Sequence, residues 1–248
     1  MLSFLKDHPF AVQAFFERSL VLTFAIPKEE AYQLIPPCLE PDTLNDQWAF
    51  IAAAMVETKN LRPKGFPSFM GNDFFLIGYR VFVLYKNNAG KRLRGLYILG
   101  STTNKRKMQF FGNIFTHYNY KTTDIIQEKE GNKLNIHSGS SNFHVTANLN
   151  GSEETELPLE SPFQDWKQAR RFAGPLPFTF TFDPKTNKVL IIEGVRENWE
   201  PRPVQVLEQH FSFIDDLNLK EVKLANAFVI ENIPYYWKKG KSELWKPA

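Results

Sequence analysis

The sequence predicts a mainly β protein in which antiparallel strands close on themselves and a few short helices lie at the periphery. Short apolar runs separated by turn residues recur along all 248 residues. No linker, repeat or low-complexity tract divides them, so we expect one domain over residues 1–248. A closed sheet would leave none of these apolar strands at an exposed edge.

The N-terminal region predicts a helix, a strand and a second helix in that order. Asp7 can cap a helix over residues 7–18, and an apolar run at 20–24 predicts a buried strand. Pro27 then suits the start of a short helix. Pro36-Pro37 must end it, because proline lacks the amide donor.

The central region predicts three strands. Residues 48–55 form an apolar run after the turn signal Asn45-Asp46. Residues 74–85 and 95–101 are apolar runs on either side of a connection at 86–90, which is typical of an antiparallel hairpin.

The second half predicts a meander of strands with one further helix. The helix would begin at Ser161-Pro162 and end at Gly174-Pro175. The expected strands cover residues 133–137, 143–149, 178–182, 189–192, 209–214 and 222–230.

Composition argues against several classes of protein. The formal net charge is +3, with acids and bases spread along the chain, so no concentrated basic face for nucleic acid is expected. No apolar run reaches the length of a membrane span, and the N-terminal residues 1–8 have no apolar core of signal-peptide length. Cys38 has no cysteine to pair with, which favours a reducing compartment, the cytoplasm.

Sequence motifs for cofactor and metal binding are missing. The chain has no G-x-G-x-x-G, no phosphate-binding loop, no H-E-x-x-H and no nucleophile elbow, so we expect no cofactor. His137 and His144 could meet across a hairpin, but two histidines without a nearby carboxylate make a weak metal site, and we expect none.

Two polar features stand out against the apolar pattern. Arg80 interrupts the run at 74–85, where a charge must pair, reach solvent or point into a wet cavity. The basic cluster at 105–107 reads as a solvated turn before a buried strand.

One segment resembles a known family. Residues 24–42, FAIPKEEAYQLIPPCLEPD, resemble the strand, helix and P-x-x-L-E-x-D opening of the acetoacetate decarboxylase superfamily. The similarity extends over about residues 15–120, including RGLYIL at 94–99, and is closest to an uncharacterised branch that keeps an arginine where Arg80 stands. The resemblance implies a cone-like closed antiparallel β-barrel, flanked by helices, with a cavity inside.

The resemblance also implies that the family's reaction is missing. Its enzyme forms an imine between a lysine and a keto acid. The paired-lysine positions fall on Phe115 and Thr116, and a neighbouring Arg-Glu pair falls on Met108 and Gln109. Schiff-base decarboxylation is therefore not expected.

The first functional hypothesis is a small-molecule-binding protein or a non-decarboxylating enzyme, with a small organic acid or carbonyl compound as ligand. Arg80, Gln109, Thr116 and Arg18 are its expected ligand contacts. His117 is its candidate catalytic residue, because it titrates near neutrality and could transfer a proton.

Two alternatives stay open. One is a keto-acid decarboxylase with a relocated lysine, such as Lys107 or Lys121. The other is a non-catalytic protein that self-associates through an exposed aromatic patch at residues 235–237. A homo-oligomer is compatible with either.

Overall fold

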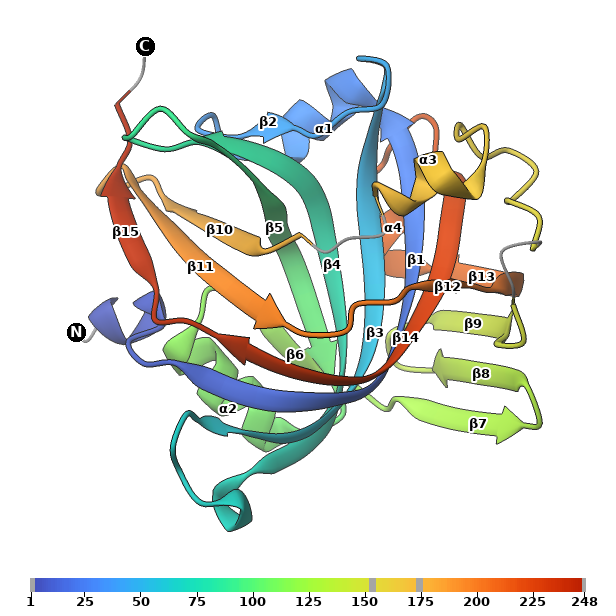
Figure 1. The fold of residues 1–248 in the computed structure, drawn as a ribbon, viewed down its shortest axis with the longest axis horizontal. Coiled ribbons are helices and arrows are strands. Elements are labelled where there is room, and N and C mark those ends of the chain that lie inside the picture. The colour runs from blue at the N-terminus through green and yellow to red at the C-terminus, as the bar shows by residue number, and fades with distance from the viewer. Residues whose placement is uncertain (1–2, 152–154, 173–175, 247–248) are drawn as a thin grey trace.

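The protein is built around a closed ring of strands. The computed structural model describes residues 3–151, 155–172 and 176–246. Neighbouring strands pair in ring order, and β11 pairs back with β14 to close the cone (Figure 1). The ring strands are β14 (Lys223–Trp237), β1 (Val12–Pro27), β3 (Trp48–Pro63), β4 (Asn72–Lys86), β5 (Arg92–Thr103), β10 (Phe178–Asp183) and β11 (Lys188–Arg196).

A second, smaller sheet packs on the outside of this ring. Its strand order is β13 (Gln205–Phe211), β9 (Phe143–Asn148), β8 (Lys133–Ser138) and β7 (Ile126–Glu130). Leu22, Met55 and Ile77 from the ring share a buried cluster with Ile136 and Val145 of the small sheet. Apolar burial therefore holds the two sheets together.

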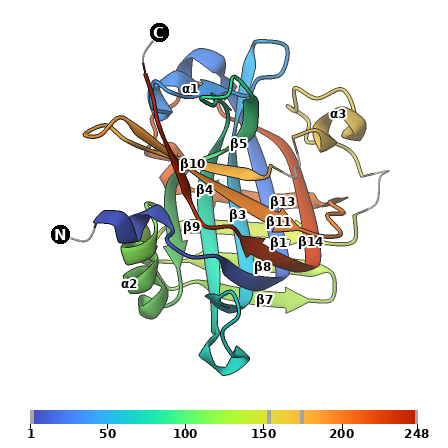
Figure 2. The same cartoon turned by 60° about the vertical axis from the view of Figure 1, so that its left-hand side comes forward.

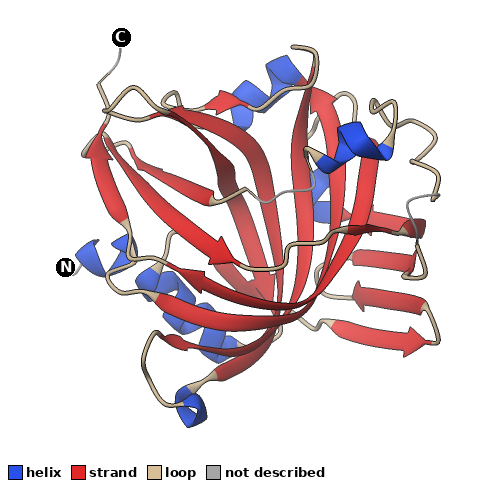
Figure 3. Cartoon of the chain, in the orientation of Figure 1, coloured by secondary structure: helices blue, strands red, loops and turns tan. Residues whose placement is uncertain are grey.

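Helices and short strands lie at the periphery of the cone (Figure 3). Helix α2 lies beside the 3-10 turn η1 at one end of the molecule (Figure 2). No helix within the described residues is long and apolar enough to cross a membrane. The peripheral helices are η1 (Ser3–Asp7), α1 (Lys28–Leu34), η2 (Ser68–Met70), α2 (Arg106–Phe115), α3 (Trp166–Arg170) and α4 (Ser212–Asp215). The short strands are β2 (Glu40–Pro41), β6 (Tyr120–Thr122), β12 (Arg202–Pro203) and β15 (Lys241–Leu244).

The predicted fold class is confirmed, as is the order of most elements. The strands expected at 20–24, 48–55, 74–85 and 178–182 all lie in the ring. His137 and His144 pair directly across the β8–β9 hairpin. The ring is not antiparallel throughout, because β5 pairs with β10 in parallel.

The helix predicted for residues 7–18 is wrong. Strand β1 starts at Val12 and pairs along its length with both β14 and β3. Ladder hydrogen bonds on both sides outweigh the helical spacing of its aromatic residues, since local propensity is a weak prior.

The basic cluster at 105–107 does not lead into a strand. Helix α2 starts at Arg106 and places Met108, Phe111, Gly112 and Phe115 along one side. The prediction of a turn before a strand is therefore wrong, and the helical spacing of these residues is visible in the sequence.

The helix predicted to start at residue 161 and the strands predicted at 209–214 and 222–230 have different bounds in the structure. Helix α3 covers only Trp166–Arg170, where the Asp165 carboxylate accepts a hydrogen bond from the Gln168 amide. Its predicted end, Gly174-Pro175, lies outside the described residues. Strand β13 gives way to α4 at Ser212, and β14 continues past Pro234 to Trp237.

The small side chains of β3 make room inside the cone. Both faces of residues 49–56 are buried, which explains why this run does not alternate with polar residues. Ala52 and Ala54 face the interior, where their methyl groups leave a hollow beside Arg80.

Candidate functional site

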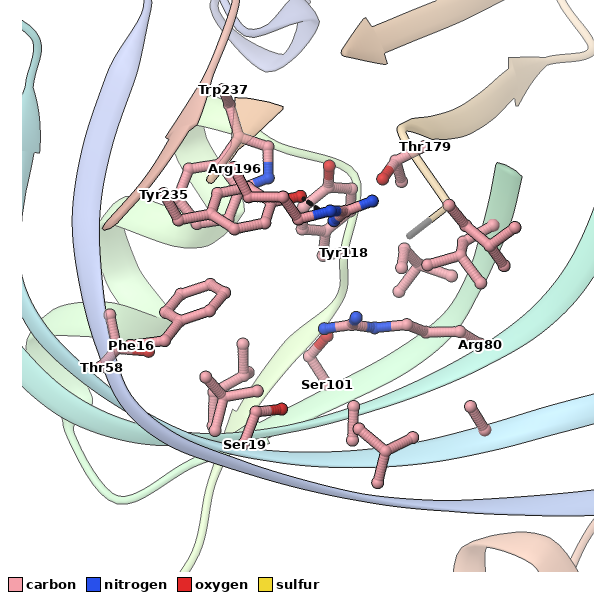
Figure 4. A pocket seen from close by; sticks show the side chains of 18 of the residues that line it. Phe16, Ser19, Thr58, Arg80, Ser101, Tyr118, Thr179, Arg196, Tyr235 and Trp237 are labelled. Atoms are coloured by element: carbon pink, nitrogen blue, oxygen red, sulfur yellow. Dashed lines mark hydrogen bonds between the residues drawn. The ribbon is translucent and has the colours of Figure 1, made fainter. Parts of the chain in front are cut away.

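The ring encloses a chamber with a volume of about 130 Å³. Apolar side chains form much of its wall. Polar side chains reach it from the seven ring strands, from β6 and from the connection between α2 and β6 (Figure 4). They are Ser19, Thr58, Arg80, Ser101, Tyr118, Tyr120, Thr179, Arg196 and Tyr235. We call this space the arginine chamber.

Arg80 reaches the chamber because of strand alternation on β4. Residues 78, 80 and 82 share the inward face, while Ile77 and Tyr79 belong to the outer core. The Arg80 Nε atom is buried and has no hydrogen-bond partner. Burial in the protein lowers the pKa of the Arg80 guanidinium, and the neighbouring tyrosines oppose this effect. Burying a guanidinium without a counter-ion destabilises the folded protein, so such a residue is expected to have a functional role.

The absence of a side chain at Gly78 leaves room for the Arg80 guanidinium. A Cβ atom at residue 78 would lie 2.8 Å from Arg80 Nε and 3.0 Å from Nη2. The guanidinium therefore lies against the glycine backbone, in space that any other residue would fill.

Arg196 enters the same chamber from β11. Its Nη1 donates a hydrogen bond to the Tyr235 hydroxyl at 2.9 Å, and its guanidinium lies 4.6 Å from the centre of the Trp199 ring. Its Nη2 is buried without a hydrogen-bond partner, and burial lowers its pKa. Gly194 again makes room, because a Cβ there would lie 2.0 Å from the Tyr235 hydroxyl.

Two tyrosines of the chamber, Tyr118 and Tyr120, can act as neutral donors. Burial raises the pKa of both Tyr118 and Tyr120 far above the ordinary value, so their hydroxyls stay protonated at neutral pH. Thr179 is a hydrogen-bond partner of Tyr118. No aspartate, glutamate or lysine occurs among the described residues that line the chamber. Two cationic side chains, Arg80 and Arg196, together with neutral hydrogen-bond donors, favour the binding of an anion in the chamber.

Of the five site residues predicted from sequence, Arg80 lines the chamber. Thr116 donates from Oγ1 to the Gly112 carbonyl at 2.8 Å and faces a neighbouring hollow. Gln109 lies on α2, and its Oε1 accepts a hydrogen bond from the Thr122 amide at 3.1 Å.

His117 and Arg18 are paired with carboxylates elsewhere. His117 Nε2 lies 3.4 Å from Asp7 Oδ1, and Arg18 Nη2 lies 3.1 Å from Glu57 Oε2. Neither side chain lines the chamber. The structure therefore does not bring the five predicted residues together.

Eight polar residues of the chamber were not predicted from the sequence; five of them come from the first half of the chain and three, Thr179, Arg196 and Tyr235, from the second. A signal for Arg196 was present: Gly194-Val195-Arg196 repeats the pattern Gly78-Tyr79-Arg80. In both, the glycine and arginine share one strand face. Tyr118 and Tyr120 had no comparable signal.

The exposed aromatic patch considered for residues 235–237 is wrong. Tyr235 and Trp237 point into the chamber, where Tyr235 stacks on Phe16 at 4.7 Å between ring centres. Tyr236 alternates to the other face, with Lys64 Nζ 4.2 Å from its ring centre. Strand alternation divides the three aromatic residues between two faces.

The closed β-cone places the protein in the class with the acetoacetate decarboxylase-like fold, which several solved structures share. Acetoacetate decarboxylase from Legionella pneumophila has a TM-score of 0.63 at 12% identity, covering 95% of this chain and 88% of that chain. An acetoacetate decarboxylase-like enzyme from Sphingomonas wittichii has a TM-score of 0.58 at 8% identity, covering 98% and 94%. The enduracididine biosynthesis enzyme MppR, solved with pyruvate, has a TM-score of 0.56 at 9% identity, covering 94% and 90%.

Within this class the chain belongs to the DUF2071 family, described as an uncharacterized conserved protein. The family model matches residues 14–238. No curated protein matches the sequence. The family and the solved structures thus agree on the scaffold, and the chemistry must be inferred from the chamber.

Proposed function

We propose that the arginine chamber binds a small organic acid, with its carboxylate between Arg80 and Arg196. One observation carries this proposal: both guanidinium groups are buried, and each has a nitrogen without a hydrogen-bond partner. A carboxylate would neutralise the charge and accept hydrogen bonds from those nitrogens. Thr58 Oγ1, also buried and unpaired, adds a further polar contact.

The chamber also suits a carbonyl oxygen. The protonated hydroxyls of Tyr118 and Tyr120 are donors that could hold such an oxygen beside the carboxylate. A 2-oxo acid carries both groups. MppR, which shares the fold, was solved with pyruvate, and this supports pyruvate as the first probe for this chain.

The lining does not support an imine mechanism. An imine requires an amine nucleophile, and the described lining residues include no lysine. We infer a binding protein or an enzyme that polarises its ligand without a covalent bond. Incubation with pyruvate and borohydride is expected to leave every lysine unmodified.

The proposal is tested by comparing acids with their neutral amides. We expect pyruvate and acetoacetate to raise the melting temperature and to bind in calorimetry, while pyruvamide and acetoacetamide do neither. An acid at a hundred times its Kd stabilises the fold by about 2.7 kcal/mol. Equal binding of acids and amides, or no binding of any acid, would contradict the proposal.

Substituting Gly78 tests the position of Arg80 without removing its charge. In Gly78→Ala the new methyl group occupies the place of the guanidinium. We expect binding of pyruvate to weaken about tenfold or more, since hydrogen bonds to charged groups contribute about 1.5–3 kcal/mol. Stability should change by less than about 1 kcal/mol, because the φ angle of residue 78 is not positive.

The matched control is Gly139→Ala in the β8–β9 turn. There a Cβ would lie 3.5 Å from Asp124 Oδ2, an ordinary contact far from the chamber lining. Calorimetry should find its pyruvate affinity unchanged. If Gly78→Ala also binds like the wild type, Arg80 does not hold the acid.

A further inference from the structure

A second hollow adjoins the arginine chamber between α2 and the ends of β1 and β3. Its volume is about 390 Å³, three times that of the chamber. Its wall is largely apolar, and we call it the apolar annex. The residues that characterise it are Phe10, Val12, Leu61, Met70, Phe111 and Phe115.

The annex and the chamber share a wall. Five side chains line both spaces, so only the thickness of these side chains separates one from the other. They are Leu61, Met108, Tyr118, Tyr120 and Trp237. Met108 is unbranched and has three rotatable bonds, which lets it adapt to a chain passing beside it.

The annex keeps aromatic surface partly open to solvent. Phe10 is 37% exposed and Phe111 is 42% exposed, although each contacts a further ring. Phe10 packs edge-on against Phe115 at 5.2 Å, and Phe111 stacks with Phe115 at 6.4 Å between ring centres. Two rings from α2 and one from the segment before β1 thus form an apolar wall that a bound ligand would shield from water.

The charges at the annex are compatible with an acid. Arg62 and Lys107 line it, and no carboxylate does among its described lining residues. Arg62 is held by the carbonyl oxygens of Phe66 and Asn60. His8 also lines the annex, and burial lowers its pKa to about 4, so it is neutral at pH 7.

We infer that the ligand is a carboxylic acid with an apolar tail, whose head lies in the arginine chamber and whose tail lies in the annex. This inference rests on the proposed function for the position of the head. A small chamber that holds two arginines, separated only by side chains such as Met108 from a larger apolar space, matches an amphipathic acid better than a short one.

The test is a series of straight-chain acids measured by calorimetry, below the concentration at which they form micelles. Affinity is expected to rise from propanoate through hexanoate to decanoate, by about fourfold for each methylene that becomes buried. If propanoate binds and longer acids bind no tighter, the inference is wrong and the proposed function stands. If no acid of any length binds, the proposed function itself is wrong.

Two neighbouring substitutions on α2 locate the tail. Phe111→Glu places a carboxylate in the annex and is expected to weaken decanoate binding at least about tenfold while leaving propanoate unchanged. Phe110→Glu makes the same change of charge at a residue that is 62% exposed and does not line the annex. It should bind both acids like the wild type.

If Phe111→Glu and Phe110→Glu lose decanoate binding equally, the inference is wrong, because the added negative charge alone would then explain the loss. Undiminished decanoate binding in Phe111→Glu would overturn it as well. Binding of decanoate that survives Arg80→Met would place the acid at some other apolar surface and would also count against it.

Discussion

Replacing Arg80 by methionine is expected to weaken acid binding strongly and to stabilise the unliganded protein. Truncating one partner of a buried, hydrogen-bonded charge pair costs about 2–5 kcal/mol of binding, so affinity should fall by about thirtyfold or more. Without ligand the buried guanidinium has an unsatisfied Nε, and methionine fills similar space without charge. We expect the free energy of unfolding to rise by about 1–4 kcal/mol.

The two opposite effects distinguish a ligand-binding arginine from a structural one. Calorimetry with pyruvate measures the first effect, and urea unfolding without ligand measures the second. If Arg80→Met instead destabilises the protein and binds pyruvate normally, Arg80 is part of the scaffold only.

Arg18→Met is the matched control. Arg18 was also expected from sequence to contact the anion, but it pairs with Glu57 at 3.1 Å outside the chamber lining. Its replacement should leave pyruvate affinity unchanged. Stability should change by no more than about 1 kcal/mol, as is usual for a partly exposed ion pair.

Replacing Phe50 by alanine is expected to cost about 3–5 kcal/mol of stability. Phe50 is 0% exposed, and its ring lies 4.5 Å from that of Phe172 and 5.1 Å from that of Phe163. It is also 6.2 Å from the ring of Phe82. Removing the ring leaves a cavity behind the chamber wall, because Phe82 and Phe172 both line the chamber.

Urea unfolding measures this loss, with Phe69→Ala as the control. Phe69 is 85% exposed, so its removal should change stability by about 0.5 kcal/mol or less. A loss below about 1 kcal/mol in Phe50→Ala would show that the segment carrying α3 is not firmly packed on the ring.

Much of the fold could be predicted because it depends on local patterns. Apolar runs located the strands at 20–24, 48–55 and 74–85, and Pro36-Pro37 ended α1 as expected. The prediction for the N-terminal region was wrong because local helical spacing competes there with strand pairing. Residues 12–18 have helical spacing, but β14 and β3 pair with them on both sides.

Only part of the site could be predicted. Arg80 was found because a charge within an apolar run needs a polar environment on its own strand face. Gln109 and Arg18 were placed by counting along a short resemblance, and His117 was chosen as the titratable residue beside the counted positions. Such counting does not show which way a side chain points. In the structure all three are bound to partners away from the chamber lining.

The sequence by itself determined most of the strands, the proline-bounded helix α1 and the need of Arg80 for a partner, solvent or a wet cavity, because each depends on neighbours within a few residues. Only the tertiary structure decided what Arg80 faces. Arg196 and Tyr235 meet it because β11 pairs with β14 and closes the ring. That pairing joins segments about forty residues apart, and no local period encodes which faces a closed sheet brings together.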